Sequence, residues 1–343
     1  TETEKETRAE PRQTPRFTSV RFDDVDAEKA YAAASRLTSE IEKVIVGKHR
    51  EVLLLITAML AGGHVLIEDV PGVGKTTLAV ALGKTLGLKY NRIQFTPDVL
   101  PSDIVGFSMY NKETGAFEYR SGVVSQTNLL LGDEINRTSS KTQSALLEAM
   151  EERQVTVDGN TYPLQRPFVV IATQNNVGTA GTQLLPYAQL DRFLVRLSIG
   201  YPDHDAQVAI LRDRQKSDPI SSVEQAVSRE DVIRMQQEVR NVSAKDSILD
   251  YITDLAMASR VHPMIEVGIS PRGALFLDRM SKAHAYMDGR DYVTPEDVQA
   301  IFADVCGHRM ILNQRARLSG ASTEQIMSDI LGSVRVPDHG QTR

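Results

Sequence analysis

Short apolar runs alternate along the chain with longer segments in which apolar residues recur every three or four positions. The short runs are typical of strands buried on both faces of a parallel sheet, and the periodic segments are typical of helices. Strand-like segments lie at residues 65–67, 91–95, 128–131, 168–172 and 194–199, and the third and fourth are almost wholly apolar. This alternation predicts an α/β fold with a parallel sheet.

Helical periodicity occupies the spaces between these runs and dominates the sequence after residue 203. Helices are expected from residue 26, over 49–60, 76–86 and 140–153, and then over 205–214, 229–240, 245–259, 271–287 and 294–310. The later group contains no strand-like run. We therefore expect an all-α domain after the α/β core.

Two segments in the α/β region have the alternation of β-hairpins. Residues 107–120 place aromatic residues on both sides of a Lys-Glu-Thr-Gly turn, and residues 154–164 are centred on Asp-Gly. Asp-Gly is a strong hairpin turn signal. The first hairpin is either a surface insertion without a role of its own or a loop that reaches into a central pore.

The domain boundary is expected at the break Tyr201-Pro202-Asp203. Residues 23–202 then form the α/β core, and residues 203–318 form a helical lid. Residues 1–22 are polar without apolar periodicity, so a disordered N-terminal tail is expected. Residues 319–343 also become polar, which predicts a flexible C-terminal tail.

The first apolar run leads into a glycine-rich turn and then an alanine- and leucine-rich helix. Gly72 and Gly74 let the backbone curl around an anion, and the helix N-terminus adds partial positive charge. Lys75 is placed to contact phosphates, and the Thr76 hydroxyl to join a Mg²⁺ shell. One position departs from the usual P-loop pattern, because Asp69 stands where the first glycine is expected. A chance Gly-Lys-Thr is the alternative.

Polar side chains end two later runs. Asp133 and Glu134 follow the 128–131 run, and Asn175 follows the 168–172 run. In doubly wound folds such strand ends lie beside the P-loop. Asp133 can hold Mg²⁺, and Glu134 is placed to deprotonate an attacking water. The alternatives are solvated carboxylates and an ordinary turn asparagine.

Composition narrows the class of protein. Hydrophobic residues make up 41% of the 343 residues, the formal net charge is −6, and there is one cysteine, Cys306. Mild net acidity without basic clusters argues against non-specific nucleic-acid binding. One cysteine excludes an intramolecular disulfide and a cysteine metal cluster. With no membrane-length apolar run and no signal-peptide pattern, a cytoplasmic location is expected.

Together these motifs resemble AAA+ ATPases, and more narrowly the MoxR family. The resemblance covers about residues 26–318 and rests on five segments, which are 95–104, 133–137, 141–150, 172–175 and 189–193. It implies that both hairpins are insertions shared with magnesium chelatase and dynein-like relatives. Tyr187 and Asn176 depart from the family pattern, as does Thr138-Ser139-Ser140.

The resemblance also implies roles for individual residues. It makes Glu134, Asn175, Arg192 and Arg272 catalytic residues: the Walker B base, sensor 1, the arginine finger offered to the neighbouring subunit, and sensor 2. It assigns Thr76 and Asp133 to Mg²⁺ and assigns ATP to Val46, Gly47, Pro71, Gly72, Val73, Gly74, Lys75, Thr76 and Thr77. Arg137 is a further candidate for a contact across the subunit boundary.

The implied function is ATP hydrolysis by a ring, expected to be a hexamer. The ring would remodel or assemble a client protein, or aid metal or cofactor insertion, with a partner that carries a von Willebrand factor A domain. A nucleic-acid motor is one alternative, but Lys112 and Arg120 in the first hairpin are balanced by Glu113 and Glu118. An ATP-gated binding module with slow turnover is the other, and the complete Asp133-Glu134 pair speaks against it.

Overall fold

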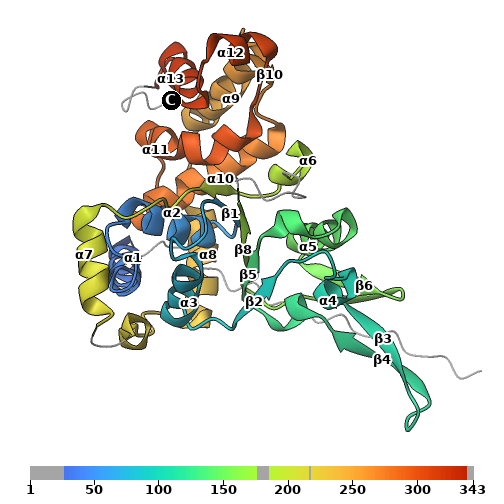
Figure 1. Cartoon of the computed structure of the whole chain (residues 1–343). Helices are drawn as coiled ribbons and strands as arrows, with labels where there is room; N and C mark the ends of the chain where they lie inside the picture. Colours follow the sequence, from blue (N-terminus) through green and yellow to red (C-terminus); the bar gives the residue numbers. More distant parts are fainter. Residues whose placement is uncertain (1–26, 176–184, 216–217, 338–343) are drawn as a thin grey trace, which may run out of the picture.

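The computed structural model describes residues 27–175, 185–215 and 218–337. Its centre is a five-stranded parallel sheet in the order β2-β5-β8-β1-β9 (Figure 1). The strands are β1 (Val65–Glu68), β2 (Tyr90–Gln94), β5 (Leu129–Asp133), β8 (Val169–Gln174) and β9 (Val195–Leu197). The predicted parallel α/β sheet is confirmed, with each strand within a few residues of its expected position.

Alternate residues of the strands face two separate apolar clusters. Val65, Ile67, Leu129 and Leu131 belong to the larger cluster, together with residues of the helices on that face. Leu66 and Leu130 belong to the smaller cluster on the opposite face. Because both faces are covered, the inner strands β1, β5 and β8 are apolar over most of their length, whereas the edge strand β2 is largely polar.

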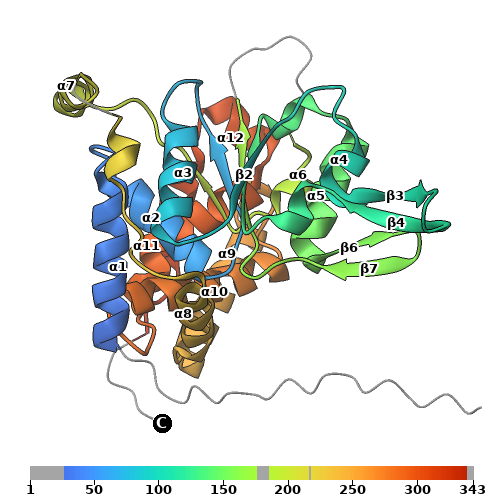
Figure 2. The same ribbon diagram turned by 90° about the horizontal axis from the view of Figure 1, so that it is seen from below.

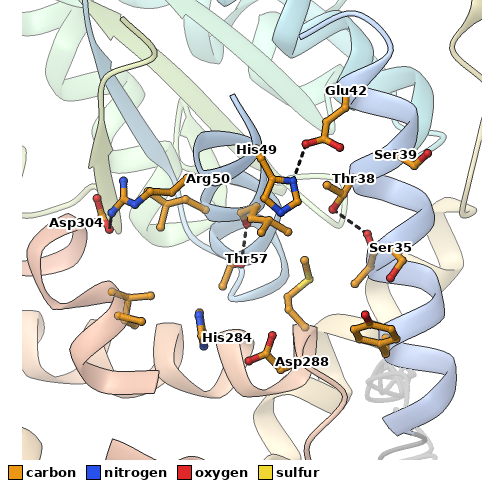
Figure 3. Close-up of a pocket in the computed structure, with 17 residues that line it drawn as sticks. Ser35, Thr38, Ser39, Glu42, His49, Arg50, Thr57, His284, Asp288 and Asp304 are labelled. Atoms are coloured by element: carbon orange, nitrogen blue, oxygen red, sulfur yellow. Dashed lines mark hydrogen bonds and ion pairs between the residues drawn. The ribbon is translucent and has the colours of Figure 1, made fainter. Parts of the chain in front are cut away.

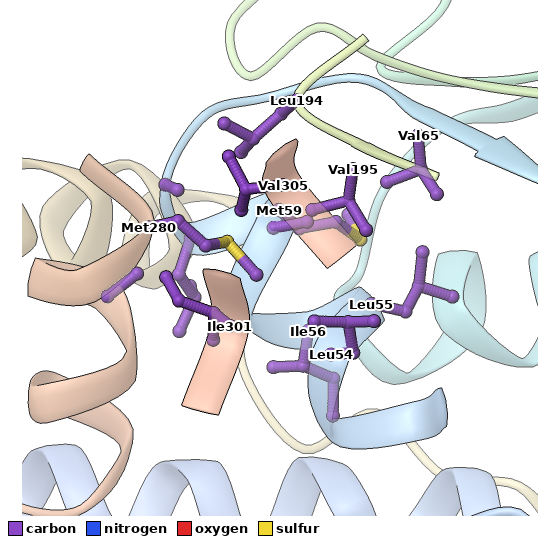
Figure 4. Packing of buried hydrophobic residues seen from close by; sticks show 14 of the residues in the cluster. Leu54, Leu55, Ile56, Met59, Val65, Leu194, Val195, Met280, Ile301 and Val305 are labelled. Atoms are coloured by element: carbon purple, nitrogen blue, oxygen red, sulfur yellow. The ribbon is translucent and has the colours of Figure 1, made fainter. Parts of the chain in front are cut away.

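Helices cover both faces of the sheet. In the α/β region they are α1 (Ala27–Glu42), α2 (His49–Leu60), α3 (Lys75–Thr85), α4 (Pro101–Val105), α5 (Ser140–Glu152) and α6 (Tyr187–Leu190). Short 3₁₀ turns η1 (Val123–Gln126) and η2 (Ile135–Arg137) flank β5. Apolar side chains of α2 lie between the sheet and two helices of the later region, as Figure 4 shows for Met59 beside Val195 and Val305.

Both predicted hairpins are present and project from the same side of the molecule (Figures 1 and 2). The first pairs β3 (Gly106–Asn111) with β4 (Ala116–Ser121), and the second pairs β6 (Gln154–Val157) with β7 (Asn160–Pro163). The rings of Tyr119 and Tyr162 stack with centroids 4.0 Å apart, so one aromatic contact joins the two hairpins.

The later region is helical, as predicted. Its helices are α7 (His204–Asp213), α8 (Arg229–Asn241), α9 (Asp246–Val261), α10 (Pro271–Met287), α11 (Pro295–Cys306) and α12 (Gln314–Ser319), with 3₁₀ turns η3 (Pro219–Ser222) and η4 (Gly307–Arg309). A short antiparallel pair that was not predicted, β10 (Ile265–Val267) with β11 (Ile311–Leu312), is added to them.

The flexible C-terminal tail predicted for residues 319–343 is wrong over much of its length. Helix α13 (Thr323–Ser333) buries Ile326, Met327 and Ile330 against the lid. Ser322 begins it with a capping box to Gln325, and this start signal is readable in the sequence. The predicted N-terminal tail, residues 1–22, lies outside the described residues, and the domain boundaries remain predictions.

Among the described residues, none of the helices combines the length and the apolar character needed to cross a membrane.

Candidate functional site

The loop between β1 and α3 has the backbone shape that its glycines predict. Gly72 and Gly74 adopt φ angles of 88° and 95°, a region that costs other residues strain. The loop borders a cavity of about 390 Å³ that also contains Lys75, Thr76, Thr77, Asp133, Glu134 and Asn175. The structure therefore brings together residues from three separate sequence motifs.

Not every residue of the loop lines this cavity. Pro71 does, whereas the Val73 side chain packs against the larger apolar cluster. Val46 lies in the α1–α2 connection and shares a small adjoining cavity with Thr77 and Arg214. Gly47, with φ of 74°, has α7 close against it, because a Cβ there would lie 3.0 Å from that of Ala206.

Lys75 and the strand-end polar residues form one connected network. Lys75 Nζ donates to Asn175 Oδ1 at 3.2 Å and to the Asp69 carbonyl at 3.2 Å. Asn175 Nδ2 donates to Glu134 Oε1 at 2.5 Å. Burial lowers the pKa of Lys75, and the carboxylates of Asp69, Asp133 and Glu134 act in the opposite direction. An anion bound beside Lys75 would therefore favour the protonated, positively charged form of the lysine.

Glu134 is constrained by its backbone and by three donors. Its φ of 57° is left-handed, a costly conformation for a non-glycine residue that is common at functional sites. Besides Asn175, Gln94 Nε2 donates to Oε2 at 2.9 Å, and Arg137 Nη1 donates to the same oxygen at 2.8 Å. Sequence patterns did not reveal Gln94. Arg137 pairs within its own chain, which gives no support to its predicted contact across a subunit boundary.

Asp133 is buried beside Glu134 and is bound from two strands. Arg92 Nε donates to Oδ2 at 2.7 Å, and the Thr173 hydroxyl donates to Oδ1 at 3.2 Å. Thr173 Oγ1 also accepts the backbone N–H of Glu134 at 2.9 Å. Carboxylate and hydroxyl oxygens are ligands that Mg²⁺ prefers. Asp133 and Thr76 line the same cavity, so these residues fit a magnesium ion.

The acidic residue at the missing-glycine position has a structural role. Asp69 Oδ2 accepts the backbone N–H groups of Ile199 and Gly200 at 2.6 and 2.7 Å, and the Ser198 hydroxyl at 3.2 Å. Oδ1 accepts the Val70 N–H at 2.9 Å. The carboxylate thus ties the start of the P-loop to the chain that leaves β9.

Arg192 and Arg272 do not line the P-loop cavity of their own chain. Both lie in a second cavity of about 240 Å³, which also contains Glu151, Arg153 and Arg279. Arg192 Nη1 lies 2.9 Å from Glu151 Oε2, and Arg272 Nη2 contacts Glu151 Oε1. The lining residues described for the two cavities have no member in common. The two predicted catalytic arginines therefore lie together, apart from the other predicted catalytic residues.

Comparisons with known proteins identify the family. Residues 64–195 match the model of the "ATPase family associated with various cellular activities (AAA)", and residues 257–330 match that of the AAA lid domain. The chain is 36% identical to chaperone MoxR1 of Mycobacterium tuberculosis over 88% of this chain and 82% of that protein. It is 31% identical to protein MoxR of Methylorubrum extorquens, covering 88% and 93%. This chain belongs to the MoxR family of AAA+ ATPases.

Two further relatives are similar over most of the chain. Protein YeaC of Bacillus subtilis, which has no characterised function, is 48% identical over 90% of this chain and 97% of its own length. The crystal structure of a candidate ATPase from Cytophaga hutchinsonii superposes with a TM-score of 0.84 at 39% identity, covering 91% of this chain and 97% of that one. Membership supports nucleotide binding and ATP hydrolysis, and AAA+ proteins generally assemble into oligomeric rings.

The family's Leu-Asp-Arg-Phe segment is held in place by a buried arginine that sequence patterns did not identify. Arg309, from η4, is 0% exposed, and its Nε lies 3.0 Å from Asp191 Oδ1. Its Nη2 donates to the carbonyl of Asp191 at 3.1 Å. Tyr187, a departure from the family pattern, donates its hydroxyl to the Arg309 carbonyl at 2.8 Å. Arg192 thus extends from a segment fixed to the lid.

The largest cavity described, about 580 Å³, lies elsewhere, between α1, α2, α10 and α11 (Figure 3). Many of its polar groups bond to one another, as in the pairs His49 with Glu42 and Arg50 with Asp304. At its edge His284, Asp288 and Asp297 lie close enough to hold a cation. Arg290 already bonds to both carboxylates there, so a guanidinium supplies the positive charge.

Proposed function

We propose that this chain forms a hexameric ring that hydrolyses ATP in sites shared between adjacent copies. The observation that carries this proposal is the separation of the two cavities. Lys75, Glu134 and Asn175 lie in one, and Arg192 and Arg272 lie in the other. ATP bound to one copy's P-loop therefore lacks these two arginines unless a neighbouring copy supplies them.

Within one copy, the P-loop N–H groups and Lys75 bind the phosphates. Thr76 and Asp133 would hold Mg²⁺, which neutralises phosphate charge when bound. Glu134 orients the attacking water and accepts its proton. Asn175 contacts both Lys75 and Glu134, so it links the phosphate-binding cation to the base. The neighbour's Arg192 and Arg272 stabilise charge on the transferring phosphoryl group.

We propose a protein client, because of the hairpins. The first hairpin presents Phe107, Met109, Tyr110 and Phe117 as exposed side chains, with Phe117 75% exposed. Exposed apolar groups that lie together are typical of protein-binding surfaces. A nucleic-acid motor needs positive charge there, and the four charged residues of the hairpin sum to zero. The hairpins lie apart from the lid (Figures 1 and 2), where movement between subunits would displace them.

The chaperone-like role extends to assembly of a complex or insertion of a metal or cofactor, with a von Willebrand factor A domain partner. This part rests on family resemblance, as does the proposed cytoplasmic location. Slow turnover as a simple ATP-gated binding module is the competing function. The strained Glu134 backbone and its three donors favour hydrolysis, because they hold a base in a defined position.

The test measures ATPase activity per subunit against protein concentration for the wild type, Glu134→Gln and Arg192→Ala. We expect wild-type specific activity to rise as rings assemble, and both variants to be impaired. Equal turnover by all three proteins contradicts the proposed mechanism, and activity independent of concentration contradicts the shared site. Stimulation of the wild type by DNA would favour the motor. Glu134→Gln, as a substrate trap, is also the variant with which to isolate the client and partner.

A further inference from the structure

A single carboxylate contacts both arginines of the second cavity. Each oxygen of Glu151 serves one of them, Oε2 for Arg192 at 2.9 Å and Oε1 for Arg272. Arg192 Nη1 also donates to the Leu147 carbonyl, one helical turn before Glu151, at 3.2 Å. The three charged side chains are 33–39% exposed. They are thus open to a neighbouring molecule while bonded to one another.

Two of these residues occupy unfavourable ends of their helices. Glu151 lies in the last turn of α5, where the helix dipole disfavours an anion. Arg272 is the second residue of α10, where the dipole disfavours a cation. Their pairing offsets both penalties. A charged residue at an unfavourable helix end lowers the stability of the fold. Such residues are expected at functional sites, where the location of the charge matters more than its effect on stability.

The other charged residues of the second cavity are positive, so the negative charge of Glu151 is favourable there. Arg153 and Arg279 line the same cavity. Burial, and after it repulsion from neighbouring arginines, lowers the pKa of both. Arg192 and Arg272 therefore approach one another in a region that already disfavours more positive charge. Among the residues described as lining this cavity, Glu151 is the one that carries negative charge.

We propose that Glu151 is a positioning residue that holds Arg192 and Arg272 at a fixed separation for the neighbouring copy's terminal phosphate. A guanidinium has five N–H donors, and Glu151 contacts one nitrogen of each arginine. The remaining donors stay available to phosphate oxygens. This inference rests on the proposed function, and it assigns Glu151 no contact with ATP in its own copy.

The test compares Glu151→Gln with Glu152→Gln. Glu152 is the next residue of the same helix end. It forms no ion pair with the part of the chain that the structure describes, and it undergoes the same change of charge. Glu151→Gln is expected to lower kcat about 10- to 100-fold, because misplaced catalytic groups cost this much. Binding of a fluorescent ATP analogue is expected to stay at the wild-type value. The Tm is expected to fall only slightly, because the ion pairs are partly exposed. Glu152→Gln is expected to keep wild-type kcat.

A double-mutant cycle separates positioning from general stability. In an Arg272→Ala background, Glu151→Gln is expected to lower kcat far less than in the wild type, because one of the two arginines that it positions is gone. Additive effects overturn the proposal. So does a Glu151→Gln variant with wild-type or higher kcat, which would show that the carboxylate is dispensable or competes with phosphate.

The Arg192→Ala variant distinguishes failure of this inference from failure of the proposed function. If Arg192→Ala lowers kcat and Glu151→Gln does not, the shared site stands and the role of Glu151 is wrong. If Arg192→Ala keeps wild-type kcat, the shared site itself fails, and the positioning role fails with it.

Discussion

The two functional cavities differ in how their charges are balanced. At the P-loop, each carboxylate has a donor: Arg92 binds Asp133, and Gln94, Arg137 and Asn175 bind Glu134. In the second cavity four arginines surround one acid, Glu151. The P-loop cavity carries the proposed base and the proposed metal ligands, whereas the second cavity carries excess positive charge. On the proposed function, the two cavities of one chain are complementary halves of a phosphate site that two adjacent copies complete.

We expect the largest loss of ATPase activity when the proposed arginine finger, Arg192, is removed. Arg192→Ala should lower kcat about 10³- to 10⁵-fold, the range for trans arginine fingers, while ATP binding by each copy's own P-loop persists. Steady-state ATPase assays and ATP-analogue binding check this. Arg212→Ala, on α7 and outside both cavities as described, is the matched control and should remain active.

The base should matter next. Glu134→Gln keeps the size of the side chain and its acceptor oxygen, but it cannot take a proton. We expect kcat to fall about 10²- to 10⁴-fold with ATP affinity retained, measured by single-turnover hydrolysis. Glu266→Gln, a substitution of the same kind at an exposed position of β10, should behave as wild type. Substantial hydrolysis by the Glu134→Gln variant would contradict the assignment of Glu134 as the base.

The sequence patterns predicted the P-loop half better than the second half, and the reason is physical. The glycines, Lys75 and the strand-end acids act through local backbone geometry, so short motifs carry them. Glu151 and Arg272 are 121 residues apart and meet only in the folded chain. Gln94 and Arg309 were missed for a similar reason, because their partners lie on other elements. Helix α13 was missed although its capping box is a local signal that the sequence carries.

Asp69 is a residue of the P-loop whose role is to stabilise the fold, whereas Glu134 acts in the proposed reaction. Asp69→Asn should lower the free energy of unfolding by about 1.5–3 kcal/mol, the range for a hydrogen bond to a charged group. It should change kcat far less than Glu134→Gln does. Urea unfolding with Asp250→Asn, an exposed change on α9, as the control checks this. An unchanged urea midpoint would contradict the role given to Asp69.

Acid should destabilise the fold at the wall of the second cavity. His64 lines that cavity, donates to the Met150 carbonyl through Nε2, and accepts the Val170 N–H through Nδ1. Burial lowers the pKa of His64 to about 3. Its contribution is therefore fully present above the unfolded pKa of about 6.5 and declines by about 1.4 kcal/mol per pH unit between 6.5 and 3.

Unfolding titrations from pH 7 to pH 5 check this contribution in the wild type and in His64→Gln. Buried His308, whose pKa is also lowered by burial, adds a term of the same sign. The variant should therefore keep part of the slope and lose the His64 part. Identical slopes in the two proteins would contradict the assignment.

The most direct test of the shared site mixes two impaired variants. Lys75→Ala copies lack a working P-loop but supply Arg192, and Arg192→Ala copies supply an intact P-loop. If the site is shared, random mixed rings should restore activity at about a quarter of the sites, those in which an intact P-loop faces an intact arginine. If each copy contains its whole site, the mixture will show only the average of the two separate activities.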